Sequence, residues 1–416
     1  MAADAEWYVR PEKLNWISAT RTGQAVSACA SILLLAACSI SGMGPSPRGE
    51  SGVGAAASPV DAVAVPVSPN GPTLGAGPVK VALILPLTQG AGQSVVGQSL
   101  RNAAELALSE TGASDITILI KDDRSTPEGA REATQAAVAE NADLFLGPLF
   151  ANDVRAAAEV ARAAGKPVIA YSTDMSSATR GVYLLSFLVE SYVERIVDFA
   201  ASKGRKSIAV LAPESDYANV AVGALQQAAA RRDVRVAAIE RYKSGGVAAA
   251  VGRVAALGEQ IDTLFIPEQA AAMPEVARAL TAAGLDSRKV QIVGTGLWND
   301  SRVLGLAALQ GAWFPAPENA GFAAFAQRYR AKFGSDPTRV ATLAYDSVSL
   351  AAALARTQGA RRYSEEVLTN ASGFNGADGV FRFRTDGGNE RALSVLQVNN
   401  GGTIVVSPAP RSLSGT

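Results

Sequence analysis

The sequence predicts an α/β protein with parallel sheets flanked by helices and divided between two lobes. From residue 79 onward, short apolar runs alternate with longer segments of helical periodicity. Such runs are typical of strands buried on both faces, and helices between them favour parallel pairing. The chain has 416 residues, which is more than one hydrophobic core usually covers. We therefore expect its ordered part to form two lobes.

The first elements carry the clearest local signals. The run "VKVALILPLT", which begins at residue 79, predicts a buried strand, and residues 97–110 predict a helix. Apolar residues recur on one face of this helix at Leu100, Ala103, Ala104, Ala107 and Leu108. "ITILIKDD" predicts the next strand. Thr126 is then a predicted N-cap, with Pro127 at the first position of a helix that ends at Glu140.

Six further runs, separated by alanine-rich helices, predict the remaining strands: "ADLFLGPL", "KPVIAYST", "KSIAVLAP", "VRVAAIERY", "DTLFIPEQ" and "VQIVGTG". Near the C-terminus, residues 380–383 and 393–399 are predicted as two short strands. The sequence "TDGG" at 385–388 and the residues after it supply the turn between them. Residues 408–416 are expected to form a flexible tail.

Composition excludes several classes of function. The chain has 38 Lys plus Arg and 38 Asp plus Glu, so its formal net charge is zero. A nucleic-acid-binding protein needs a positive surface, which this charge balance does not supply. The chain has no histidine, which removes the commonest general base and the commonest zinc ligand. We therefore expect no enzyme activity, no cofactor, no metal and no nucleic-acid partner.

The N-terminal part predicts secretion and attachment to lipid. Residues 25–37 carry no charge and are too few to cross a membrane, as is typical of a signal-peptide core. The sequence "LAAC", which ends at Cys38, resembles a bacterial lipobox, in which the cysteine becomes the lipidated N-terminus. The other interpretation is a buried helix with an incidental cysteine. The Gly, Pro, Ser and Ala residues that follow favour the first interpretation, with a signal peptide at 1–37 and a disordered tether at 38–78.

The order of these elements resembles the type 1 periplasmic binding proteins of the leucine/isoleucine/valine-binding kind. "VALILPLTQGAGQSVVGQSLRNAAELAL" is similar to that family's first strand, ligand loop and helix, and "ADLFLGPLFANDV" to its third strand with a Gly-Pro turn. "KPVIAYST" resembles its fourth strand, and "PESDYAN" the start of the second lobe's first helix. "LAYDSVSLAAALA" and "FNGADGVFRFRTDGG" resemble its late helix and closing hairpin.

The resemblance covers residues 79–406 and implies two lobes joined by three crossing segments, with a ligand held between the lobes. We place the crossings near Glu190, Pro315 and Gly359. The expected lobe boundaries are 79–189 plus 316–358 for lobe 1, and 190–315 plus 359–407 for lobe 2. Physical reasoning agrees with this placement, because open α/β sheets bind ligands beyond the carboxyl ends of their strands.

The candidate ligand site in lobe 1 lies in the loops after the first, third and fourth strands. Its members are Thr88, Gln89, Gly147, Pro148, Leu149, Tyr171, Ser172 and Thr173. Hydroxyls and backbone N–H groups in these loops would serve as donors to a ligand. The other interpretations are flexible connections and capping of the next segment. The resemblance implies a serine hydroxyl just past the Gly-Pro turn of amino-acid binders, where this chain has Leu149 and Phe150.

In lobe 2 the candidates are Asp216, Tyr217 and Glu268. Asp216 and Tyr217 would close over a ligand, and Asp216 is equally suited to cap the helix that follows. Glu268 would meet a ligand amine. The adjacent carboxylates Asp122 and Asp123 point in different directions at a strand end, so we expect capping and solvation of them rather than acid–base catalysis.

Two functions stay open at this point. The first is a lipid-anchored periplasmic protein that binds a small molecule (an amino acid, a peptide or a cell-wall fragment) and presents it to an ABC permease. The second follows from a resemblance to the outer-membrane lipoproteins called penicillin-binding-protein activators, which regulate peptidoglycan synthases. Ser39 after the cysteine resembles the sorting signal that sends lipoproteins to the outer membrane.

Overall fold

The computed structural model describes residues 72–111 and 114–413. The predicted signal peptide, Cys38, Ser39 and most of the tether lie outside the described residues. Among the helices of the described part, none is long and apolar enough to cross a membrane.

The first sheet has six strands in the order β1-β5-β2-β6-β7-β8. Its strands are β1 (Thr73–Leu74), β2 (Val79–Leu85), β5 (Ile116–Asp122), β6 (Leu144–Leu146), β7 (Val168–Ala170) and β8 (Val182–Leu184). From β5 to β8 all neighbours are parallel, and only β1 is antiparallel to its partner. The parallel arrangement predicted from the apolar runs is therefore confirmed.

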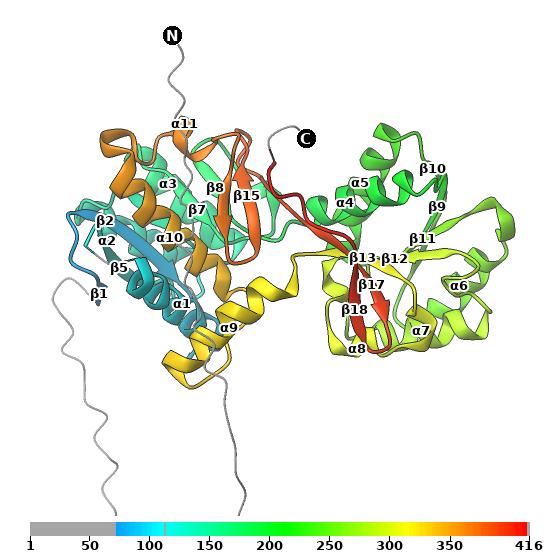
Figure 1. The fold of residues 1–416 in the computed structure, drawn as a ribbon. Helices are drawn as coiled ribbons and strands as arrows, with labels where there is room; N and C mark the ends of the chain where they lie inside the picture. Colours follow the sequence, from blue (N-terminus) through cyan, green and yellow to red (C-terminus); the bar gives the residue numbers. More distant parts are fainter. Residues whose placement is uncertain (1–71, 112–113, 414–416) are drawn as a thin grey trace, which may run out of the picture. The chain divides into compact units, whose positions relative to one another are not determined.

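Helices cover both faces of this sheet, which explains why its strands are mainly apolar (Figure 1). Val81, Leu83 and Leu85 of β2 face one core, and Ala82 and Ile84 face the other, since side chains alternate along a strand. The first core is closed by α1 (Val95–Thr111), α9 (Asn319–Phe333) and α10 (Ala341–Thr357). The second core is closed by α2 (Pro127–Ala139) and α3 (Ala151–Ala163).

The ordered part begins before residue 79, where we had placed its start. Thr73 pairs with Leu119 and Leu74 with Ile118, so β1 lies along the edge of β5. The Gly- and Pro-rich composition of this segment hid the strand. Pairing of a two-residue edge strand depends on backbone groups, which composition does not report.

The second sheet has seven strands in the order β10-β9-β11-β12-β13-β17-β18. They are β9 (Ser207–Pro213), β10 (Arg235–Tyr242), β11 (Thr263–Phe265), β12 (Gln291–Val293), β13 (Trp313–Ala316), β17 (Ser394–Asn399) and β18 (Gly402–Ser407). The first five strands in this order are parallel, whereas β17 and β18 are antiparallel to their neighbours. Four helices pack on its two faces: α4 (Val189–Ser202) and α5 (Asp216–Arg231) on one, and α6 (Val247–Ala255) and α7 (Met273–Ala282) on the other.

The C-terminal hairpin differs from the prediction. Residues 380–383 do not pair with 393–399, because a strand that we missed lies between them. A small antiparallel sheet contains β14 (Phe374–Gly376), β15 (Gly379–Phe383) and β16 (Asn389–Arg391), and the predicted "TDGG" turn joins β15 to β16. The predicted second strand, β17, pairs with β13 in the second sheet.

The third crossing is therefore later in the chain than Gly359. Tyr363, Leu368, Phe381 and Phe383 are buried in the core of the first sheet. This segment, including α11 (Glu365–Leu368), consequently belongs with lobe 1, and the chain reaches the second sheet only at β17. The assignment of residues 359–391 to lobe 2 was wrong because these buried aromatic side chains fill a gap in the first core.

The residues after β18 are also more ordered than the predicted tail. Leu413 is buried, at 4% exposure, and its carbonyl oxygen accepts a hydrogen bond from Arg382 (2.7 Å). The prediction of a flexible tail is thus wrong for residues 408–413.

Hydrogen bonds tie the three crossing segments together. Asn389 donates to the carbonyl oxygens of Leu184 (2.6 Å) and Ser186 (3.0 Å), which begin the first crossing. Glu318 lies in the second crossing. It accepts a hydrogen bond from the hydroxyl of Ser394 (2.9 Å), a residue that follows the third crossing. The joint between the two sheets is therefore built from buried polar contacts that secondary-structure patterns do not reveal.

Candidate functional site

The loop after β2 is fixed by a carboxylate at the end of β5. One oxygen of Asp122 accepts from the backbone N–H groups of Leu87 (3.0 Å) and Thr88 (3.1 Å), and the other accepts from the Thr88 hydroxyl (2.7 Å). The Thr88 hydroxyl is thus already bonded, whereas Gln89 is exposed. Asp122 therefore holds the predicted ligand loop, a role that differs from the capping and solvation expected of it.

Asp123 does not behave as predicted. It is fully buried, so solvation was the wrong expectation. One carboxylate oxygen accepts from the Ser125 N–H group (2.8 Å), while Oδ2 has no hydrogen-bond partner among the described residues. Thr126, by contrast, caps α2 as predicted, since its hydroxyl accepts from the Gly129 N–H group.

The Gly-Pro turn after β6 is held by close packing and by backbone hydrogen bonds, from Gly147 N–H to the Ile169 carbonyl oxygen (2.8 Å) and from Tyr171 N–H to the Pro148 carbonyl oxygen (2.9 Å). A Cβ atom on Gly147 would lie 2.0 Å from the carbonyl oxygen of Ile84, so this position needs glycine for close packing. Leu149 is half-buried against the core of the first sheet. Phe150 is the N-cap residue of α3 without a side-chain hydrogen bond, and it is 43% exposed. An apolar ring therefore stands in the loop where amino-acid binders of the resembled family have a hydroxyl.

The loop after β7 brings a second correction. The hydroxyl of Tyr171 lies 2.7 Å from that of Ser347 in α10, and the residue is 1% exposed. It is therefore part of the core and does not offer its hydroxyl to a ligand, and burial raises its pKa. Ser172 is buried and accepts from the Asp174 N–H group (3.1 Å), which is the capping role considered as the alternative. Only Thr173 is exposed here.

At the carboxyl end of β9, capping falls to Ser215 rather than to the predicted Asp216. The Ser215 hydroxyl accepts from the Ala218 N–H group (3.2 Å), and Asp216 is exposed in the first turn of α5. The Tyr217 hydroxyl donates to the hydroxyl of Thr295 (2.8 Å), which follows β12. Burial raises the pKa of Tyr217. Asp216 therefore does not cap α5, because Ser215 makes the capping hydrogen bond.

This assignment of the cap predicts a difference between two neighbouring substitutions. Ser215→Ala is expected to lower the free energy of unfolding by about 1 kcal/mol, because α5 loses its N-cap. Asp216→Ala is expected to cost less, since it removes only the favourable charge near the helix N-terminus. Urea denaturation followed by circular dichroism measures both. A larger loss in Asp216→Ala would contradict the assignment.

Glu268 is the most constrained of the predicted site residues. It follows β11, is 5% exposed, and accepts from the Tyr242 hydroxyl (2.5 Å) and from the Gln269 N–H group (2.7 Å). Burial and the neighbouring Glu268 raise the pKa of Tyr242, which stays a donor. Glu268 lines a cavity of about 340 Å³ at the carboxyl ends of β9, β10 and β11, together with Lys243 and Glu275. A carboxylate held in this way is suited to accept hydrogen bonds from a ligand amine.

Sequence reasoning missed a cluster of charges and aromatic rings at the joint between the sheets. Arg339 makes two hydrogen bonds to Asp378 (2.9 and 2.7 Å), and its guanidinium lies over the rings of Phe187 (4.5 Å) and Phe322 (4.6 Å). Arg391 also lies over Phe187 (4.6 Å). The only available signal was that Asp378 stands in the "FNGADGV" motif; the partners come from distant parts of the chain.

Arg391 and Asp346 are buried ionisable side chains of this cluster, as Asp378 is. Arg391 is 6% exposed and donates from Nε to the Ser186 carbonyl oxygen (2.9 Å). Asp346 accepts from the Ala377 N–H group (2.7 Å). Burial raises the pKa of Asp346 to about 7, against the opposing effect of Arg391. These groups position the crossing segments rather than line an open cavity.

The structure thus gathers the predicted residues at the carboxyl edges of the two sheets, but it commits several of them to internal contacts. Gln89 and Thr173, which are exposed, and Glu268, which lines a cavity, are the best placed to meet a ligand. In residues 72–111 and 114–413, no three acidic or thiol side chains come together as a metal ion would need. The described part therefore offers fixed acceptors and donors, which suit binding.

Comparisons with known proteins agree with this architecture. A family model described as periplasmic binding protein matches residues 78–403. A search of curated proteins found no match. Among solved structures, a putative branched-chain amino acid ABC transporter protein from Rhodospirillum rubrum has a TM-score of 0.69 and 19% identity, and the match covers 79% of this chain and 99% of that one.

Two further solved structures are complexes with a ligand. The branched-chain amino acid binding protein LivJ of Streptococcus pneumoniae, in complex with isoleucine, has a TM-score of 0.55 and 22% identity over 79% of this chain and 99% of that one. A solute-binding protein of R. palustris in complex with benzoate has a TM-score of 0.56 and 20% identity, and the match covers 81% of this chain and 97% of that one. At these identities the likeness shows the fold. Together with the family match, it establishes that the chain belongs to the periplasmic binding protein family.

Proposed function

We propose that the chain is a non-catalytic, lipid-anchored periplasmic protein that binds a small ligand between its lobes. The observation that carries this proposal is Glu268, a buried carboxylate fixed by two hydrogen bonds at the carboxyl end of a parallel strand. Membership of a family of binding proteins supports it. Open α/β sheets bind ligands at this edge.

The ligand class that fits Glu268 best carries an amino group, such as an amino acid, a short peptide or an amine-bearing cell-wall fragment. Its ammonium group would donate to Glu268 in lobe 2. Its other end would meet the exposed loops of lobe 1, near Gln89 and Thr173. Contacts that form only when both lobes touch the ligand would favour the closed state, which is the signal an ABC permease would receive.

Glu268→Gln is expected to weaken binding of an amine-bearing ligand by about 10–100-fold, because a charge-assisted hydrogen bond is lost. The measurement is isothermal titration calorimetry of the full chain with leucine, isoleucine, valine, short peptides and muropeptides. Benzoate, which lacks an amine, serves as the comparison ligand. Glu259→Gln is the control, because this carboxylate is exposed and does not line the cavity, so it should leave affinity within about twofold. Equal affinities in Glu268→Gln and the parent would reject the role of Glu268.

The lipid anchor is a separate part of the proposal. It rests on the "LAAC" sequence that ends at Cys38 and on Ser39, which favours the outer membrane. Mass spectrometry of the mature N-terminus tests it. An unmodified Cys38, or a mature chain that retains residues before it, would contradict lipid attachment.

A second candidate function is favoured by the loop after β6. Leu149 packs on the core and Phe150 exposes its ring, so this loop lacks the hydroxyl that amino-acid binders use. An exposed ring suits contact with a protein, as expected of a lipoprotein that activates a peptidoglycan synthase. Phe150→Ala is then expected to lower recovery of a synthase in pull-downs from the native host, with transport unaffected. A permease recovered instead would favour the first function.

A further inference from the structure

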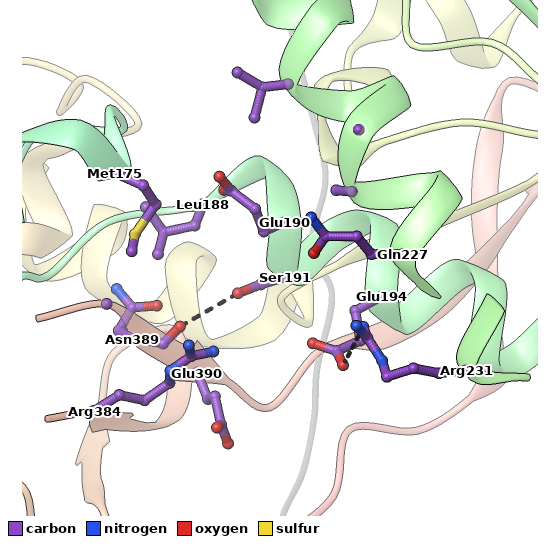
Figure 2. Close-up of a pocket in the computed structure, with 14 residues that line it drawn as sticks. Met175, Leu188, Glu190, Ser191, Glu194, Gln227, Arg231, Arg384, Asn389 and Glu390 are labelled. Atoms are coloured by element: carbon purple, nitrogen blue, oxygen red, sulfur yellow. Dashed lines mark hydrogen bonds and ion pairs between the residues drawn. The ribbon is translucent and has the colours of Figure 1, made fainter. Parts of the chain in front are cut away.

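A second cavity in the described part has a volume of about 440 Å³. Its wall combines Met175 in the loop after β7, the start of α4, one face of α5, and the turn between β15 and β16 (Figure 2). None of the candidate ligand-site residues predicted from the sequence lines it. A molecule in this cavity would touch the loop after β7 of the first sheet and helices α4 and α5, which pack on the second sheet.

The cavity contains an acceptor that the fold holds in place without a donor. Asn389 is 2% exposed, and its side-chain NH₂ group donates to the carbonyl oxygens of Leu184 and Ser186. These two bonds fix the amide orientation, so its Oδ1 atom must be the free end. Oδ1 is buried and has no hydrogen-bond partner among the described residues. A buried acceptor in this state favours a ligand with N–H or O–H donors.

A second acceptor, Glu190, comes from the first turn of α4. Its Oε2 atom is buried and likewise has no partner in residues 72–111 and 114–413. Figure 2 shows Glu190, Met175 and Asn389 around the same end of the cavity. Two unsatisfied oxygens and a thioether thus surround one space.

The charge balance selects the class of ligand. Glu194 is paired with Arg231 (3.0 Å), Glu390 with Arg382 (2.6 Å), and Arg384 with Asp386. Glu190 is therefore the carboxylate in the wall that no cation of the described part neutralises at ion-pair distance. We propose that this cavity binds an organic cation that carries a primary ammonium group, with Glu190 and Asn389 as its acceptors.

The α5 side of the cavity leaves room for such a ligand. A Cβ atom built on Gly223 would meet nothing within 4 Å. Gly223→Leu would therefore extend a side chain into the cavity without a clash, and leucine is a better helix former than glycine. This substitution blocks the site without a loss of stability. Gly252 in α6 is also without neighbours within 4 Å and lies outside the cavity, which makes Gly252→Leu the matched control.

The test is isothermal titration calorimetry of the full chain with putrescine, 1,4-butanediol and succinate. These probes share a four-carbon chain and differ in their charge. Putrescine is expected to bind, and the neutral diol and the dianion are not. Gly223→Leu and Glu190→Gln are each expected to weaken putrescine binding at least about tenfold, whereas Gly252→Leu should not change it.

The site does not depend on the function proposed for Glu268, and one variant separates the two. Glu268→Gln is expected to leave putrescine affinity unchanged, even if it abolishes binding of amino acids. Loss of putrescine binding in Glu268→Gln, equal affinity in Gly223→Leu and the parent, or binding of succinate as tight as that of putrescine would each overturn the proposal. Absence of any putrescine binding would overturn it as well.

Discussion

Replacement of Asp123 by asparagine is expected to stabilise the protein above pH 7. Burial raises the pKa of Asp123 from 3.8 to about 7, with a smaller contribution from the nearby Asp153 carboxylate. Asparagine keeps the acceptor for the Ser125 N–H group. Its NH₂ group would replace the unpartnered Oδ2 atom, so the variant avoids an ionised carboxylate in a buried site.

The sign of the pH dependence follows from proton linkage. A carboxyl group whose pKa is raised on folding binds its proton more tightly in the folded state. The stabilisation that comes from this tighter proton binding is therefore complete below pH 3.8. It is lost as pH rises towards about 7. A difference of about three pKa units corresponds to at most about 4 kcal/mol, so we expect Asp123→Asn to gain about 2–4 kcal/mol at pH 8.

Urea denaturation at several pH values between 4 and 8 measures this effect. The stability curves of parent and Asp123→Asn should meet near pH 4 and separate as pH rises. Asp233→Asn, at an exposed turn, is the control and should leave the curve in place. A constant offset between parent and Asp123→Asn at all pH values would contradict the assignment to ionisation of Asp123.

Gly147→Ala is expected to produce the largest loss of stability among single methyl additions in the first lobe. Gly147 has a φ of 81°, which L-residues adopt at a cost of about 1–2 kcal/mol. The added methyl group would also lie 2.0 Å from the Ile84 carbonyl oxygen, so the backbone of β2 or β6 must move. We expect a total loss of about 3 kcal/mol or more.

Gly165→Ala is the matched control for this prediction. Gly165 has a φ of 67°, but a Cβ atom there would meet nothing within 4 Å. It should therefore lose only the backbone contribution, about 1–2 kcal/mol. Thermal and urea unfolding of both variants give the comparison. Equal losses would mean that close packing on β2 is not what requires glycine at residue 147.

Much of the secondary structure could be predicted because it depends on local patterns. Strands β2, β5 and β9 are predominantly apolar runs, and α2 begins with a threonine cap followed by proline. Short strands without such a pattern were not predicted. β1 and β16 each have three residues or fewer, and β1 pairs with β5, which lies far away in the chain.

The candidate site shows the same division between local and distant information. Glu268 was predicted from its position after an apolar strand, and the structure gives it two donors. Tyr171 was chosen by the same rule, yet its hydroxyl faces Ser347, which is 176 residues later. Whether a polar side chain at a strand end faces solvent or the core depends on what packs behind it.

By itself the sequence determined the α/β class and the parallel order of the buried strands. These features follow from composition and from periodicities of two and 3.6 residues, which are local. Only the tertiary structure decided where the chain crosses between the sheets, which hydroxyls are buried, and that Glu190 and Asn389 meet in one cavity. Such contacts join residues separated by up to hundreds of positions, and they arise when cores are filled and buried polar groups find partners.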